Sequence, residues 1–99
     1  MEIINKHIKE LKSLCDTYHV NELYAFGSVV TDNFRKESDI DLLVQFGNID
    51  LMDYLDNYIN FKKSLQALFE KKVDLVEQQA IQNPILRRSI DRNKQKIYG

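Results

Sequence analysis

The sequence of 99 residues has little glycine and proline, no tryptophan and a single cysteine. Because Cys15 has no partner in the chain, no internal disulfide can form, and the chain alone cannot build a thiolate zinc site. An unpaired cysteine in such a sequence is usually a small buried apolar residue. We therefore expect Cys15 to lie in the core and not to act as a nucleophile.

Long hydrophobic runs and an excess of charge are also missing. No apolar run approaches the ~20 residues that a membrane-spanning helix needs, and the opening MEIINKHIKE lacks the apolar centre of a signal peptide. We expect a cytoplasmic protein without a membrane partner. The net charge of −1 argues against strong binding of duplex nucleic acid, which normally requires a basic excess.

The composition that is present, 43% hydrophobic and 29% charged, is typical of a globular protein, and we expect one domain over residues 1–99. Hydrophobic periodicity and turn residues predict helices over 2–19, 50–71 and 83–91, and strands over 22–26, 39–46 and 73–76, with a short edge strand at 96–99. Strands that alternate with helices predict an α/β fold (α+β in the wider sense), with helices packed against the sheet.

The helix over 50–71 is expected to be the main packing helix, with Asp50 at its N-cap. Its expected apolar stripe consists of Leu51, Met52, Leu55, Ile59, Leu65, Leu68 and Phe69. Asn83 and Pro84 form a cap and first-turn pair for the last helix.

Two aspartates open the strand DIDLLVQF. Side chains alternate along a strand, so Ile40 and Leu42 belong to a core face, and Asp39 and Asp41 belong to the opposite face, roughly 6 to 7 Å apart. A third carboxylate, Asp74, lies in the strand segment VDLV. If the two strands are neighbours, the three acidic groups come together.

Three clustered carboxylates repel one another unless a cation compensates their charge. Oxygen ligands without histidine or cysteine favour hard cations such as Mg²⁺, which is commonly shared with substrate phosphates. The Gly27-Ser28 turn could let the backbone approach a phosphate, with the Ser28 hydroxyl as a further donor. This pattern favours phosphoryl or nucleotidyl transfer, with two metal ions in the usual form of such a site.

The order and spacing of these motifs resemble those of the minimal nucleotidyltransferases of the DNA polymerase beta superfamily. The motifs are Gly27-Ser28, a spacer of ten residues, DID and then VDLV, and the resemblance runs from Leu23 to the C-terminus. It implies a nucleotidyltransferase fold with a small mixed β-sheet and flanking α-helices. It also implies that Asp39, Asp41 and Asp74 are catalytic and bind Mg²⁺, while Gly27 and Ser28 contact the triphosphate of ATP. All three carboxylates of that pattern are present in this chain.

The resemblance further implies a partner and a reaction. Small prokaryotic members of this family are often antitoxins whose partner is a helical toxin with a ribonuclease site. The expected activity is transfer of a nucleoside monophosphate, AMP from ATP, to a tyrosine hydroxyl of that toxin. An acceptor also needs a surface that a chain of this size does not supply by itself, so a homo-oligomer is the second way to complete the site.

One departure from the family pattern supports an alternative to the catalytic function. Many members carry Arg-Ala-Arg-Gly after Gly-Ser, whereas this chain has Val-Val-Thr-Asp at 29–32. Guanidinium groups are the best bidentate phosphate partners, and Arg35, Lys36, Arg87 and Arg88 are the candidates to replace them. The alternative is a non-catalytic binding module that neutralises its partner by direct contact.

Overall fold

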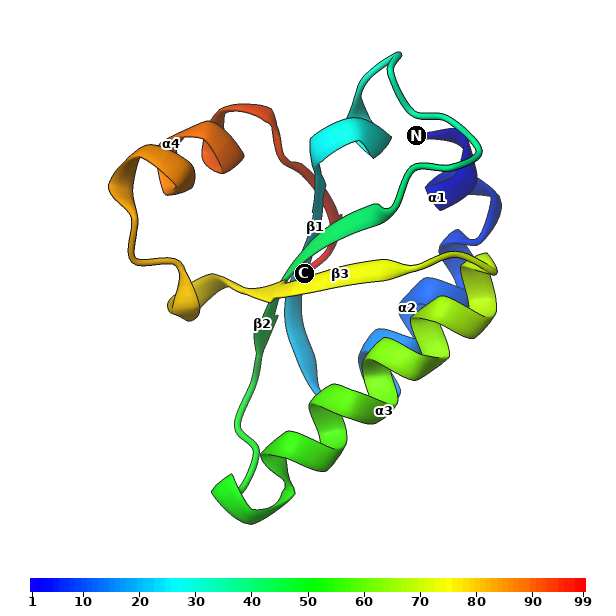
Figure 1. The fold of residues 1–99 in the computed structure, drawn as a ribbon. Helices are drawn as coiled ribbons and strands as arrows, with labels where there is room; N and C mark the ends of the chain where they lie inside the picture. Colours follow the sequence, from blue (N-terminus) through cyan, green and yellow to red (C-terminus); the bar gives the residue numbers. More distant parts are fainter.

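The computed structural model describes residues 1–99 and contains a four-stranded mixed sheet with flanking helices (Figure 1). The helices are α1 (Glu2–Lys6), α2 (Ile8–Thr17), α3 (Leu51–Phe69) and α4 (Pro84–Asn93), and two 3-10 turns are η1 (Gly27–Val30) and η2 (Gln78–Ala80). The strands are β1 (Val20–Phe26), β2 (Ile40–Phe46), β3 (Val73–Glu77) and β4 (Gln95–Tyr98).

The sheet has the strand order β3-β2-β1-β4. Strand β1 pairs antiparallel with both β2 and β4, whereas β2 pairs parallel with β3. The parallel pair requires a crossover connection, and α3 supplies it. Both predictions, a mixed sheet and a C-terminal edge strand, are confirmed.

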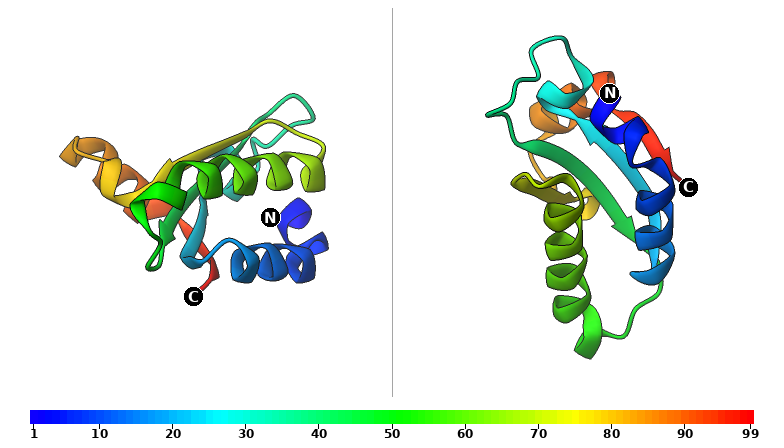
Figure 2. Two further views of the ribbon diagram at one scale, coloured as in Figure 1. Left: turned by 90° about the horizontal axis from the view of Figure 1, so that it is seen from below. Right: turned by 90° about the vertical axis from the view of Figure 1, so that its right-hand side faces the viewer.

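Helices α1, α2 and α3 lie on one face of the sheet, and α4 lies on the other side, beside η1 (Figure 2). The covered face holds a cluster of 16 buried apolar residues, in which Phe61 and Leu65 of α3 pack against strands β1 to β3. Ile40, Leu42 and Val44 point into this cluster, as the alternation of β2 predicts. Figure 2 also shows that α2 and α3 run side by side across that face.

Cys15 is fully buried in the same cluster. Burial, with a smaller contribution from the charge of Asp16, raises the pKa of its thiol to about 12. The thiol therefore stays protonated at neutral pH, and the prediction of an apolar role is confirmed.

Two sequence predictions for the helices are wrong in part. The helix expected over 2–19 is interrupted at His7, whose backbone N–H donates to Ile4 O, so α1 and α2 are separate. The expected stripe of α3 is also misplaced at its N-terminal end, where Leu51 is 89% exposed and Met52 91% exposed. The buried side of this helix instead begins with Tyr54 and Tyr58 and continues through the cluster residues at 61, 65 and 69.

The helix caps follow the sequence more closely. Asn83 Oδ1 accepts hydrogen bonds from Ile85 N and Leu86 N, and Pro84 occupies the first turn of α4, as predicted. Asp50 occupies the N-cap position of α3 but its side chain makes no capping hydrogen bond. None of the helices is both long and apolar enough to cross a membrane.

Candidate active site

The parallel pairing of β2 with β3 places two of the candidate carboxylates next to each other. Asp41 and Asp74 are direct partners in the register, and adjacent strands lie about 4.8 Å apart. Side chains alternate along a strand, and Ile40, Leu42 and Val73 point into the core that the helices cover. Asp41 and Asp74 therefore point away from that core. Asp39 lies just before β2 and is exposed, as is Asp74.

Asp41 is the least exposed of the three aspartates. Burial raises the pKa of its carboxyl above the ordinary value, and the negative charges of Asp74 and Asp39 raise that pKa further. The pairing of Asp41 with Asp74 is the neighbouring position that the sequence predicts, and the charge of Asp39 also acts on Asp41.

Gly27 lies against Asp41 at the end of β1, where Phe26 is the register partner of Asp41. Its φ is +73°, a left-handed conformation that favours glycine. A Cβ at this position would collide with Asp41 Oδ2 and would lie 3.2 Å from Asp41 Cγ. Glycine is therefore required both by the backbone conformation and by the position of the carboxylate.

The turn after Gly27 is held by its own hydrogen bonds and by one core contact. Thr31 N donates to Ser28 O over 3.0 Å, and Thr31 Oγ1 donates to the same oxygen over 2.9 Å. Val29 is buried in the core cluster and anchors η1 to the sheet. Ser28 is half-buried, so this turn fixes a backbone segment next to the aspartates.

The donor set at this place fits a hard divalent cation shared with a substrate. The like charges around Asp41 would be relieved by a cation, and all three donors are carboxylates. No three His, Cys, Asp or Glu side chains converge closely enough to enclose a metal by themselves. Mg²⁺ usually takes one or two carboxylates and completes its coordination with water and substrate phosphates, so these aspartates would not enclose it by themselves.

Helix α4 forms a further wall of the site that the sequence did not reveal. A pocket of about 280 Å³ lies between α4 and the end of β1, and Gly27 and Phe26 line it together with Leu86, Ile90 and Asn93. Ile90 is buried although it is not part of the main cluster. The amphipathic pattern of 84–93 predicts a helix, but no signal in the sequence places that helix beside Gly27.

The four candidate basic residues have different surroundings. Arg87 Nη1 donates to Gln78 O over 3.2 Å, so this side chain ties α4 to η2. Arg35, Lys36 and Arg88 are exposed. None of them forms an ion pair with the three aspartates.

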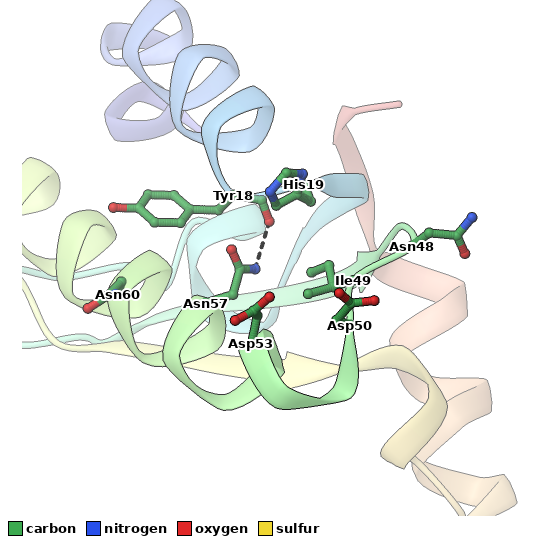
Figure 3. Close-up of a pocket in the computed structure, with 8 residues that line it drawn as sticks. All are labelled: Tyr18, His19, Asn48, Ile49, Asp50, Asp53, Asn57 and Asn60. Atoms are coloured by element: carbon green, nitrogen blue, oxygen red, sulfur yellow. Dashed lines mark hydrogen bonds between the residues drawn. The ribbon is translucent and has the colours of Figure 1, made fainter.

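A larger polar pocket lies at the opposite end of β2, between the end of α2 and the start of α3 (Figure 3). Its volume is about 450 Å³, and the amide of Asn57 donates across it to Tyr18 O over 2.8 Å. Asp50 and Asp53 line it, and its lining contains no lysine or arginine. Unlike the pocket beside α4, it also contains no glycine at which a backbone could approach a phosphate.

Paired aspartates on adjacent strands of a mixed sheet, with a Gly-Ser turn against one of them, are the features of an enzyme that transfers nucleotides. The family model described as "Polymerase beta, Nucleotidyltransferase" matches residues 9–99. The chain belongs to this family and is a nucleotidyltransferase.

Relatives with similar sequences are named as enzymes whose acceptor is a protein. A protein of Methanocaldococcus jannaschii named protein adenylyltransferase MJ1379 is 34% identical over 90 residues, which cover 91% of this chain and 86% of the relative. Protein adenylyltransferase MntA of Thermococcus cleftensis is 34% identical over 83 residues, which cover 84% of this chain and 78% of the relative.

Solved structures have the same fold. A minimal nucleotidyltransferase superposes with a TM-score of 0.78 at 29% identity, covering 95% of this chain and 92% of that chain. A toxin-antitoxin structure with AMP-PNP gives 0.72 at 19% identity, covering 93% and 73%. A tri-AMPylated HEPN toxin of Shewanella oneidensis in complex with MNT antitoxin gives 0.66 at 17% identity, covering 96% and 71%.

Proposed function

We propose that this protein is a Mg²⁺-dependent protein adenylyltransferase, and that it acts as the antitoxin of a toxin-antitoxin pair. The observation that carries the proposal is the register of Asp41 with Asp74 beside Gly27. The names of the relatives support a protein acceptor. The AMP-PNP in one structural neighbour and the AMPylated toxin in another support ATP as the donor and a toxin as the acceptor.

Asp39, Asp41 and Asp74 would hold Mg²⁺ together with the phosphates of ATP. When bound, Mg²⁺ supplies Lewis acidity and neutralises the charge of the triphosphate. Gly27 lets the backbone of the η1 turn lie directly against the Asp41 carboxylate, and so beside a phosphate that would share a metal ion with it. Ser28 would donate a hydrogen bond to that phosphate.

The chemical step forms a bond between the acceptor oxygen and the α-phosphorus of ATP. The bond from that phosphorus to the bridging oxygen breaks, and pyrophosphate leaves. The hydroxyl proton must pass to a base, and Asp74 is suited to this role because it is exposed at the edge strand, where an acceptor can approach. A tyrosine hydroxyl of a helical partner with a ribonuclease site is the acceptor that we propose.

The test is intact-mass spectrometry of the partner protein encoded by the adjacent gene, after incubation with this chain, Mg²⁺ and each nucleoside triphosphate in turn. We expect the mass to increase by one or more AMP units with ATP only. Peptide sequencing should place the modification on tyrosine. Omission of Mg²⁺ should abolish the increase.

Asp39→Asn and Asp74→Asn should both abolish transfer while the circular dichroism spectrum stays native. Asp53→Asn is the matched control, because Asp53 lines the polar pocket at the far end of β2. Retained transfer by Asp74→Asn would refute its assigned role. Modification of another residue type would refute the tyrosine acceptor.

A second function is supported by Val-Val-Thr-Asp at 29–32, where the family pattern described above has Arg-Ala-Arg-Gly. In this case the chain neutralises its partner by contact alone. A stable complex, no mass change with any nucleotide and no Mg²⁺-dependent ATP binding would establish this second function. Binding of ATP that is lost in Asp41→Asn would exclude it.

A further inference from the structure

Helices α3 and α4 each carry apolar side chains that nothing in the chain covers. In α3 these are Leu51, Met52 and Leu55, which are 89%, 91% and 65% exposed. In α4 they are Ile85 and Leu86, which are 76% and 51% exposed. Single exposed apolar residues are common, but a row of them along a helix usually marks an interaction surface.

The charges beside the two apolar rows have opposite signs. From its N-cap, Asp50, to Phe61, the first part of α3 has the acidic residues Asp50, Asp53 and Asp56 and no lysine or arginine. Helix α4 carries Arg87, Arg88 and Arg92, and its one acidic residue, Asp91, pairs with Lys94 over 2.9 Å.

The helical spacing places apolar and charged side chains next to each other on α3 and on α4. Leu51 and Leu55 are four residues apart, and Asp56 is four residues after Met52, so an acidic edge borders the apolar row. Ile85, Arg88 and Arg92 are separated by three and four residues, so they share one face of α4.

The segment from β3 to η2 connects the two rows. An apolar groove of about 460 Å³ connects Leu55 of α3 with Val76 of β3 and Ala80 of η2, and the Arg87 hydrogen bond to Gln78 connects η2 with α4. In Figure 1, the first turn of α3 lies at the bottom and α4 lies at the upper left. We call this surface, defined by residues 51–56, 76–80 and 85–92, the α3–α4 surface.

We propose that the α3–α4 surface binds a second copy of this chain. A two-fold axis through the surface would place the acidic, apolar face of α3 on the basic, apolar face of α4 of the other copy, twice and equivalently. The apolar rows then cover each other, and Asp56 of each copy faces Arg88 or Arg92 of the other. This inference does not rest on the transfer reaction proposed above, although Leu86 of this surface also lines the pocket beside Gly27.

The first test is sedimentation velocity of the full chain across the micromolar range, with circular dichroism of every variant. The native chain should form a dimer whose fraction rises with concentration. Leu55→Asp should be a monomer with a native spectrum. A native chain that is monomeric throughout this range, or a Leu55→Asp variant that still dimerises, would overturn the proposal and leave the surface to a different protein.

The second test distinguishes the pairing of α3 with α4 from non-specific association. Asp56→Arg and Arg88→Asp should each weaken self-association severalfold, because each places like charges opposite one another. An equimolar mixture of the two variants should associate again, because the arginine introduced in α3 of one chain then faces the aspartate introduced in α4 of the other. Glu10→Arg, an exposed charge reversal on α2, should leave association unchanged. Failure of the mixture to associate would refute the pairing of α3 with α4.

Discussion

The two faces of the sheet bury different side chains and support different properties. The face under α1, α2 and α3 holds 16 buried apolar residues in one cluster, including Phe61 and Leu65. The opposite face carries Asp41 and Asp74, with Leu43 and Ile90 as buried residues outside that cluster. Burial stabilises the first face, whereas clustered carboxylates destabilise the second unless a cation binds.

This comparison suggests that stability and activity can be changed separately, because alternate residues of the same strand serve the two faces. Leu42 contributes to the covered core, and its neighbour Asp41 contributes to the site. Substitutions on the covered face should mainly change the free energy of unfolding. Substitutions on the acidic face should mainly change the rate of nucleotide transfer.

Phe61→Ala on the covered face has the largest expected effect. Phe61 is fully buried, so its truncation should lower the free energy of unfolding by about 3 to 5 kcal/mol, a large part of the total for a domain of this size. Urea denaturation followed by circular dichroism measures this change. Lys63→Ala is the control on the same helix, and it should stay within about 0.5 kcal/mol of the native chain because Lys63 is exposed and lies outside the α3–α4 surface.

Asp41→Asn on the acidic face should lower the rate of transfer about a thousandfold, because metal ligation contributes several kcal/mol to such reactions. The free energy of unfolding should not fall without metal, because the substitution removes repulsion from Asp74 and Asp39. Single-turnover kinetics and urea denaturation with a chelator measure the two effects. A large loss of stability would show that the two faces are not separable at this position.

Gly27→Ala should disturb the site without removing any carboxylate. The added Cβ would collide with Asp41 Oδ2 in a backbone with φ of +73°, and displacement of Asp41 by about 1 Å could lower the rate about a hundredfold. Gly47→Ala is the matched control, since its Cβ would meet only His19 O at an ordinary 3.5 Å. Equal rates for the two variants would contradict the role assigned to Gly27.

Much of the site could be predicted from the sequence because it depends on short-range rules. Side chains alternate along a strand, so the sequence alone places Asp39 and Asp41 opposite the core residues of β2. The neighbouring position of Asp74 requires the pairing of two strands separated by a helix, which the family resemblance supplied.

Other features depend on long-range packing, which the sequence pattern does not specify. Leu51 and Leu55 have helical spacing with the buried residues of α3, but the first turns of that helix turn this row away from the sheet. The position of α4 beside Gly27 depends on how the segment after β3 returns to the sheet. The break at His7 likewise has no proline or glycine to mark it.

Cys15→Ala has the smallest expected effect on stability. It tests the packing of the covered face through the pH dependence of the free energy of unfolding. The pKa of the buried thiol is raised from 9.0 to about 12, mainly by burial, so the folded state binds this proton more tightly than the unfolded state does. Stability from the protonated thiol is complete below pH 9 and is lost as the pH rises toward 12. Relative to Cys15→Ala, the native chain should lose about 1 kcal/mol between about pH 9 and pH 10. Urea denaturation at each pH measures this difference, and equal pH dependence of the two chains would show that the thiol reaches solvent and that the covered face is less tightly packed than its burial indicates.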